Sequence, residues 1–255
     1  MDEFKDHWAI ILGGSSGLGL ASAIKLASAG MNICIVHRDR RSNLVDFEIE
    51  INKIKTHGVM VKTFNQNALD KEIRIQIIEQ LPKNSVRLLL HSIAKGSLKE
   101  LKGTNILSKD DLEITIHAMA ISWYEWSQDL IKHNLFSEKA RNIAFTSEGS
   151  NRVWPGYGAV SAAKSVLESL MRNMAIEWAD LGINTNCIQA GTTRTASFLA
   201  IPGSDILAEK TLERNPFGRL TKPEDVANAV YLLCKTEADW INGTILKVDG
   251  GESLR

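Results

Sequence analysis

The chain has 255 residues, and its 30 Lys plus Arg balance 30 Asp plus Glu, so the formal net charge is zero at pH 7. This balance gives no overall field that would attract nucleic acid or an anionic membrane surface. Residues 1–6 are charged and lack the apolar core of a signal peptide, and no later run nears the roughly 20 apolar residues of a membrane span. We therefore expect a cytoplasmic protein, folded as a single domain over residues 1–255.

Short apolar runs alternate with amphipathic stretches along the chain. The apolar runs predict strands buried on both faces, at residues 8–12, 31–36, 59–64, 86–90, 142–145, 183–188 and 244–248. The amphipathic stretches predict helices at residues 20–29, 43–56, 71–80, 109–132, 158–179 and 223–234. This alternation predicts an α/β fold, a Rossmann-type doubly wound parallel sheet of about seven strands with helices on both faces.

The turn between the first strand and the first helix is rich in glycine and serine. Its key residues are Gly13, Ser15, Ser16, Gly17, Leu18 and Gly19. Gly13 permits a tight turn, Gly17 lets the backbone approach a phosphate, and Gly19 lets the helix pack on the strand. Because the N–H groups of a helix N-terminus face such an anion, the turn predicts a dinucleotide site.

The end of the second strand indicates which dinucleotide binds. An acidic residue there would bind the ribose 2′-hydroxyl of NAD and repel a 2′-phosphate. His37 and Arg38 occupy this place and are followed by Arg40 and Arg41, although Asp39 lies among them. The local positive charge favours NADPH over NADH.

Three cysteines, Cys34, Cys187 and Cys234, lie far apart in the sequence. Their odd number and their spacing match neither a disulfide framework nor a set of metal ligands. We expect buried thiols and no metal site.

Polar residues also follow the later strands. They are His91, Ser92, Ile93 and Ala94 after the fourth strand, Ser147 after the fifth, Tyr157 and Lys164 near the start of the next helix, and residues 190–195 after the sixth. Together with the glycine turn and the Val-Asp-Gly-Gly segment at 248–251, this pattern resembles the short-chain dehydrogenase/reductase family over essentially the whole chain. The resemblance implies a nicotinamide-dependent oxidoreductase whose cofactor contacts include Ser92, Ile93, Ala94, Thr193 and Thr195. It also places Asn65 and Gln66 beside the adenine ring.

Most members of that family carry Tyr-x-x-x-Lys on one helix face, where the lysine lowers the pKa of the phenol for proton transfer. Here Val160 precedes Lys164 by four residues and cannot donate a proton. The nearby phenol is Tyr157, and Pro155 with the adjacent glycines predicts that it lies at or before the helix start. The spacing Tyr-x6-Lys resembles the enoyl-acyl-carrier-protein reductases of this superfamily, as do the His-Ser-Ile-Ala segment at 91–94 and the Ala-Gly-x-x-Arg-Thr segment at 190–195.

This resemblance implies an NADPH-dependent reductase of enoyl thioesters, in fatty acid or related acyl-chain synthesis. Tyr157 would donate a hydrogen bond to the thioester oxygen, Lys164 would hold the nicotinamide ribose, and Ser147 is a candidate substrate contact. Ser147 also keeps open a divergent carbonyl or 3-oxoacyl reductase, and a noncatalytic nucleotide-binding sensor is a third interpretation. His91, at a strand end, is expected to be a packed imidazole.

The connection at 195–214 lacks strong periodicity and follows a strand end, which predicts a substrate-binding loop as readily as a plain surface loop. The resemblance implies a substrate carried by acyl carrier protein. It also implies a homo-oligomer, a tetramer or dimer, because the family's helices equivalent to 109–132 and 158–179 pair between subunits. The aromatic residues Trp123, Tyr124 and Trp126 suit such an interface.

Overall fold

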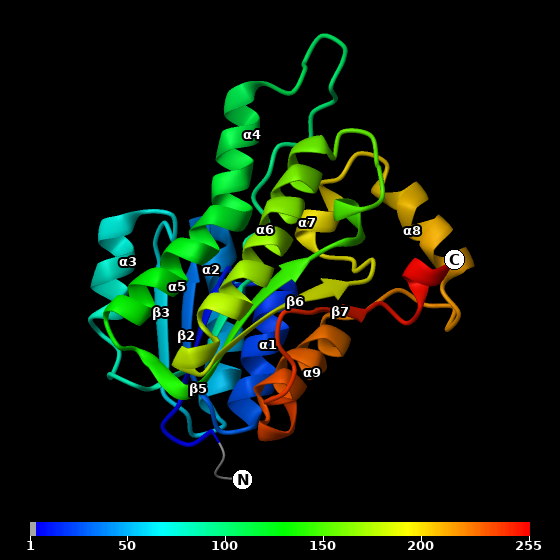
Figure 1. The fold of residues 1–255 in the computed structure, drawn as a ribbon. Helices are drawn as coiled ribbons and strands as arrows, with labels where there is room; N and C mark the ends of the chain where they lie inside the picture. Colours follow the sequence, from blue (N-terminus) through cyan, green and yellow to red (C-terminus); the bar gives the residue numbers. More distant parts are fainter. Residues whose placement is uncertain (1–3) are drawn as a thin grey trace.

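The computed structural model describes residues 4–255, so the first half of the charged segment at residues 1–6 lies outside the described residues. The described strands form a seven-stranded parallel sheet of order β3-β2-β1-β4-β5-β6-β7 (Figure 1). They are β1 (Trp8–Leu12), β2 (Asn32–His37), β3 (Val61–Asn65), β4 (Val86–His91), β5 (Phe136–Thr146), β6 (Ile183–Ala190) and β7 (Ile245–Val248). The predicted doubly wound sheet is thus confirmed, and the order reverses beside β1, where such folds bind their ligands.

Helices cover both faces of the sheet (Figure 1). One face carries α1 (Gly17–Ser28), α2 (Arg41–Lys55) and α9 (Pro223–Cys234). The other carries α3 (Lys71–Ile78), α5 (Ser122–Lys132) and α6 (Gly158–Glu177), and α4 (Lys109–Ile116) runs into α5 through a π-helical turn at His117–Ile121. Among the described residues, no helix combines the length and apolarity needed to cross a membrane.

Alternating side chains of the strands supply two hydrophobic cores, one under each helical layer. In β1, Ile10 faces the core under α5 and α6, whereas Ile11 faces the core under α1 and α9. This is the two-sided burial that the continuous apolar runs predict. Cys34, Cys187 and Cys234 are buried in these cores and form no disulfide within the described residues, as expected.

Strand β5 begins six residues earlier than the apolar pattern indicates. The added residues include Glu138 and Lys139, whose side chains are exposed, while Phe136 and Ala140 are buried. The start of β5 was not predicted because two consecutive exposed side chains interrupt the apolar run there.

The aromatic residues of 109–132 pack mainly within the chain itself. Trp123 and Trp126 are fully buried, and their Nε1 atoms donate to Asn142 Oδ1 at 2.5 Å and to the Ala68 carbonyl at 2.8 Å. Tyr124 stacks on Trp178 with ring centroids 6.1 Å apart. These side chains are therefore accounted for by the core, and they do not support the expected subunit interface.

The connection at 195–214 is more ordered than its sequence indicates. It forms α7 (Ala196–Leu199) and α8 (Ser204–Arg214). The Thr195 Oγ1 atom caps α7 by accepting from the Phe198 N–H at 3.2 Å, and Gly203, at φ 74°, turns the chain into α8. Only three α8 residues are buried, which explains the weak periodicity.

Candidate active site

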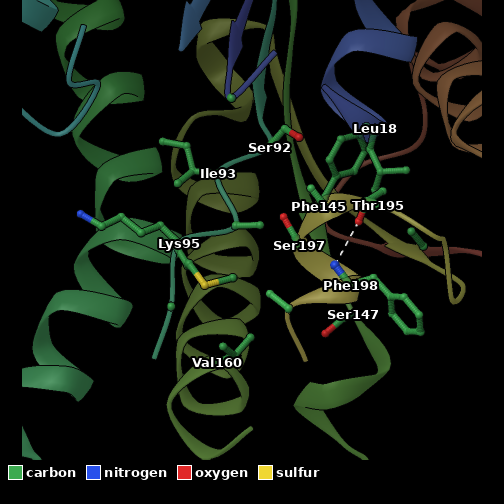
Figure 2. A pocket seen from close by; sticks show the side chains of 18 of the residues that line it. Leu18, Ser92, Ile93, Lys95, Phe145, Ser147, Val160, Thr195, Ser197 and Phe198 are labelled. Carbon is green, nitrogen blue, oxygen red and sulfur yellow. Dashed lines mark hydrogen bonds between the residues drawn. The ribbon is translucent and has the colours of Figure 1, made fainter. Parts of the chain in front are cut away.

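A cleft of about 1000 Å³ lies across the carboxyl ends of the central strands. Because these strands are parallel, the segments that follow β1, β2, β4, β5 and β6 meet at this one edge. Figure 2 shows side chains from several of them, Leu18, Ser92, Ser147 and Thr195 among them, around the pocket. All the site residues predicted from the sequence line the cleft except Gly19 and Asn65.

Neighbouring atoms require glycine at two positions of the turn between β1 and α1. A Cβ atom on Gly13, which has φ +83°, would lie 2.7 Å from the Ser92 carbonyl oxygen. A Cβ atom on Gly19 would lie 2.4 Å from the Gly13 carbonyl oxygen, so Gly19 serves the packing of α1 on β1 and does not line the cleft. Gly17, at φ +53°, faces the Thr195 side chain. A larger residue at any of these positions would collide with these neighbours or strain the backbone, and the turn would have to change its shape at the cleft.

The end of β2 presents cations to the cleft. Arg38 and Arg40 line the cleft and are exposed, and neither has a side-chain partner among residues 4–255. The Asp39 carboxylate, in contrast, is bound by His37 Nδ1 at 2.7 Å. This hydrogen bond draws the acidic side chain toward the buried His37 and leaves the arginines to meet an anion.

Asn65 has a different place from the one the family resemblance implies. Its Oδ1 accepts from the Asp39 N–H at 2.9 Å, and its Nδ2 donates to the Asp39 carbonyl at 3.2 Å. The amide therefore braces the turn that carries Arg38, and it does not line the cleft. Gln66, the other predicted residue, does line it, together with Asn67.

The segment after β4 adjoins the glycine turn. The Ser92 N–H donates to the Leu12 carbonyl at 2.8 Å, and Ser92, Ile93 and Ala94 line the cleft. His91 is buried, and its Nε2 lies 2.9 Å from Ser122 Oγ. Burial, with the nearby Lys164 charge, lowers the pKa of His91 to about 3, so it is the packed neutral imidazole that was expected.

Tyr157 is the N-cap residue of α6, at the position predicted for it. Its ring lies against Gly149, where an added Cβ atom would be 2.4 Å from Tyr157 Cε1. Burial raises the pKa of its phenol, and a hydrogen bond with the Ser147 side chain acts in the opposite direction. Val160 is buried against Met119 and Ala163. The phenol of the cleft therefore comes from position 157.

Lys164 lies seven residues after Tyr157, about two turns along α6, and is also buried. Its Nζ donates to the Phe145 carbonyl at 2.7 Å. Burial lowers the pKa of Lys164 to about 8, and charges on Cys187 and Glu168 oppose that shift. Glu168 is itself held by Thr146 Oγ1, which donates to its Oε1 at 2.5 Å. Tyr157 and Lys164 are thus brought to one cleft, beside the end of β5.

The segment after β6 closes the cleft and contains contacts that the sequence did not reveal. Thr193 Oγ1 donates to the Gly191 carbonyl at 2.9 Å, and Thr195 caps α7, as the dashed line in Figure 2 shows. Arg214 reaches back from the end of α8 to Glu148 and Glu252. These partners are 66 and 38 residues away from it, so no local spacing in the sequence points to them.

The contact between Gly149 and Tyr157 yields a prediction. Gly149→Ala should push the Tyr157 ring out of its place, because the new methyl group cannot share that space. Gly158→Ala is the matched control, since a Cβ atom there meets no atom outside residues 157–159 nearer than 3.6 Å, and the signals compared are those of the Tyr157 ring. In NMR spectra of isotope-labelled tyrosine, assigned with Tyr157→Phe, the Tyr157 signal should shift in the first variant and stay in the second. Equal spectra for the two variants would contradict the geometry.

Comparisons with known proteins agree with this arrangement. Residues 13–253 match the family described as enoyl-(acyl carrier protein) reductase. The chain is 33% identical over 190 residues to an enoyl-[acyl-carrier-protein] reductase [NADH] from Aquifex aeolicus, which covers 72% of this chain and 68% of that protein. It is 26% identical over 254 residues to an NADPH-dependent aldehyde reductase-like protein from Arabidopsis thaliana, which covers 95% of this chain and 93% of that one.

A solved structure shows the same fold. The crystal structure of an enoyl-[acyl-carrier-protein] reductase (NADH) from Aquifex aeolicus aligns with a TM-score of 0.83 at 24% identity, over 99% of this chain and 98% of the other. The relatives thus include both enoyl reductases and carbonyl-reducing enzymes. The chain belongs to the short-chain dehydrogenase/reductase family of oxidoreductases and matches its enoyl-(acyl carrier protein) reductase group.

Proposed function

We propose that the protein is an NADPH-dependent reductase of trans-2-enoyl thioesters, acting in fatty acid or related acyl-chain synthesis. The observation that carries this proposal is the placement of the phenol. The position four residues before Lys164 holds Val160, whose apolar side chain lines the cleft but has no proton to donate, whereas the phenol of Tyr157 lines the cleft from the helix start. A phenol placed there can serve as a hydrogen-bond donor to an oxyanion, which is what reduction of a conjugated double bond requires.

The residues of the cleft fit a nicotinamide dinucleotide. The glycine turn leaves room for the pyrophosphate, with Ser15 and Ser16 beside it, and Arg38 and Arg40 suit a 2′-phosphate. When bound, NADPH supplies the hydride that goes to the β-carbon of the substrate. The Aquifex relative is named for NADH and the Arabidopsis relative for NADPH, so the arginines decide our preference for NADPH.

Tyr157 and Lys164 have two different roles, one toward the substrate and one toward the cofactor. Because the pKa of Tyr157 is raised by burial, its phenol is neutral at pH 7 and can donate to the thioester oxygen as negative charge develops there. A donor in this place contributes about 3 kcal/mol to transition-state stabilisation. Lys164 would add positive charge and hold the nicotinamide ribose with the N–H donors of Nζ that the Phe145 carbonyl does not use.

Ser147 supports a second candidate function. Its side chain lines the cleft and is hydrogen-bonded to Tyr157, so the two hydroxyls could polarise one carbonyl oxygen together. In that case the substrate would be a ketone or a 3-oxoacyl thioester. Both reductions take up one proton after the hydride: at the α-carbon of the enolate formed from an enoyl thioester, where water can supply it, or at the oxygen of a reduced carbonyl. We favour the enoyl substrate because position 160, which in the resembled family supplies the proton to the oxygen, is valine.

We further propose that acyl carrier protein presents the substrate and that the enzyme is a homo-oligomer. Val153 and Lys210 are exposed at the cleft and offer an apolar and a basic contact to a carrier that brings an acyl chain. Ile114, Ile121 and Ile176 are exposed on α4, on the π-helical turn and on α6. Apolar side chains on these helices are the remaining support for a subunit interface.

The substrate assignment is tested with purified protein, NADPH and two thioesters. Loss of cofactor absorbance should be much faster with crotonyl thioester than with acetoacetyl thioester. Tyr157→Phe should lower kcat by about 100-fold, because the oxyanion loses its donor. Faster turnover of the acetoacetyl thioester would support the carbonyl reductase instead, and no turnover of either would remove both candidates.

The cofactor preference is tested at the end of β2. Arg38→Ala should raise the KM for NADPH by about 10- to 100-fold and leave that for NADH nearly unchanged, because a charge-assisted bond to phosphate is lost. Arg41→Ala is the matched control, since Arg41 is also exposed but does not line the cleft. If both variants retain the wild-type preference, Arg38 does not read the phosphate.

The pH dependence of NADPH binding tests Lys164. With a pKa of about 8, Lys164 is protonated below pH 8 and loses its charge above it. The Kd for NADPH should therefore be flat near pH 7 and rise by up to about tenfold per pH unit well above 8. Lys164→Met should bind more weakly at pH 7 and lack this rise. Fluorescence titration measures the Kd for NADPH of the wild type and of the variant. If the Kd of the variant rises above pH 8 as that of the wild type does, another titrating group causes the rise.

A further inference from the structure

A cluster of charged side chains joins three segments that border the cleft. Arg214 Nη2 donates to Glu148 Oε2 at 2.7 Å and to Glu252 Oε1 at 2.9 Å, and its Nη1 donates to Glu148 Oε1 at 3.3 Å. Arg214 ends α8, Glu148 follows β5, and Glu252 begins the short helix Glu252–Leu254 at the C-terminal end of the chain, which lies beside α8 in Figure 1. One guanidinium thus holds two carboxylates that are far apart in the sequence.

Both carboxylates act on residues of the proposed site. Glu148 lies between Ser147, which is hydrogen-bonded to Tyr157, and Gly149, which makes room for the Tyr157 ring. Glu252 accepts from the Thr192 N–H at 3.0 Å and from Thr192 Oγ1 at 2.7 Å. Arg214 therefore connects the turn under Tyr157 with the segment that follows β6, on which Thr193 and Thr195 lie.

The cluster is well shielded from solvent. The side chains of Arg214 and Glu252 are 13% and 4% exposed, and that of Glu148 is 25% exposed. Arg152 also pairs with Glu148, at 3.1 Å, but it is 55% exposed and does not contact Glu252 in the described structure. Removing Arg214 would leave two carboxylates near each other with the buried Glu252 uncompensated, and the two segments would separate.

We propose that Arg214 is a positioning residue of this enzyme: it acts through Glu148 and Glu252 to hold the Tyr157 turn at a fixed distance from the segment at 192–195. This inference rests on the proposed function, in which Tyr157 donates a hydrogen bond to the thioester oxygen of a substrate bound in the cleft. Arg214 itself contributes no spare charge to the substrate, because its guanidinium is already bound by carboxylates. Its contribution is to geometry, which decides how often the phenol meets the substrate oxygen.

Kinetics of Arg214→Gln and Arg214→Lys test the proposal. Arg214→Gln should lower kcat for the enoyl thioester by about 10- to 100-fold, as expected when reacting groups are misplaced by a small distance. The KM for NADPH should rise by a smaller factor than kcat falls, because Arg214 holds the segment that carries Thr193 and Thr195 but does not hold the glycine turn or Arg38. Arg214→Lys keeps the cation and should recover part of kcat. Arg219→Gln is the control: it removes an exposed ion pair, with Asp225, just past α8, and should leave kcat unchanged.

Hydrogen exchange separates this inference from the proposed function. With NADPH present and no substrate, Arg214→Gln should exchange faster than the wild type at residues 147–157 and 191–195, and Arg219→Gln should not. If the wild type reduces no enoyl thioester but the exchange behaves in this way, the proposed function fails while the positioning role stands. Unchanged exchange in Arg214→Gln, or a kcat equal to that of the wild type, would overturn the role of Arg214. Glu148→Gln gives the same readouts should Arg214→Gln fail to fold.

Discussion

The contact of the Tyr157 ring with Gly149 is the constraint on which the geometry of this cleft depends. The ring fits because position 149 has no Cβ atom, and the phenol then lies within a hydrogen bond of Ser147. From this start α6 places Val160 at the wall of the cleft, packed against Met119 and Ala163, and brings Lys164 to the Phe145 carbonyl. The end of β5 and the start of α6 are therefore fixed together, and the phenol is fixed with them.

Charge is distributed unevenly along the cleft. Arg38 and Arg40 offer uncompensated cations at the end where β2 stops, which suits an anionic cofactor. At the other end the cations of Arg152 and Arg214 are offset by the carboxylates of Glu148 and Glu252. These paired charges suit an uncharged thioester, while Lys210, one turn before Arg214 on α8, is exposed at the cleft and is the cation proposed to contact the carrier. Between the two ends, buried Lys164 supplies a cation, while His91 stays neutral.

The sequence allowed the sheet and the phenol to be predicted because both follow from local patterns. Apolar runs marked each strand, and the glycines and proline around Tyr157 marked the helix start. The start of β5 and the helices at 196–214 were not predicted, because their exposed residues break the apolar periodicity. Asn65 was assigned to adenine by its position in the sequence, but its side-chain amide is hydrogen-bonded to the backbone of Asp39 in the turn between β2 and α2. The Arg214 cluster arises only when distant segments meet in the fold.

The central claim is that Tyr157 is the hydrogen-bond donor to the thioester oxygen. The most direct test is a crystal structure of the enzyme with NADP⁺ and an unreactive enoyl thioester analogue. Our account predicts the Tyr157 hydroxyl within about 3.2 Å of the thioester carbonyl oxygen, with the β-carbon over the nicotinamide ring. A carbonyl oxygen bound by another group, with the phenol still directed at Ser147 alone, would contradict it.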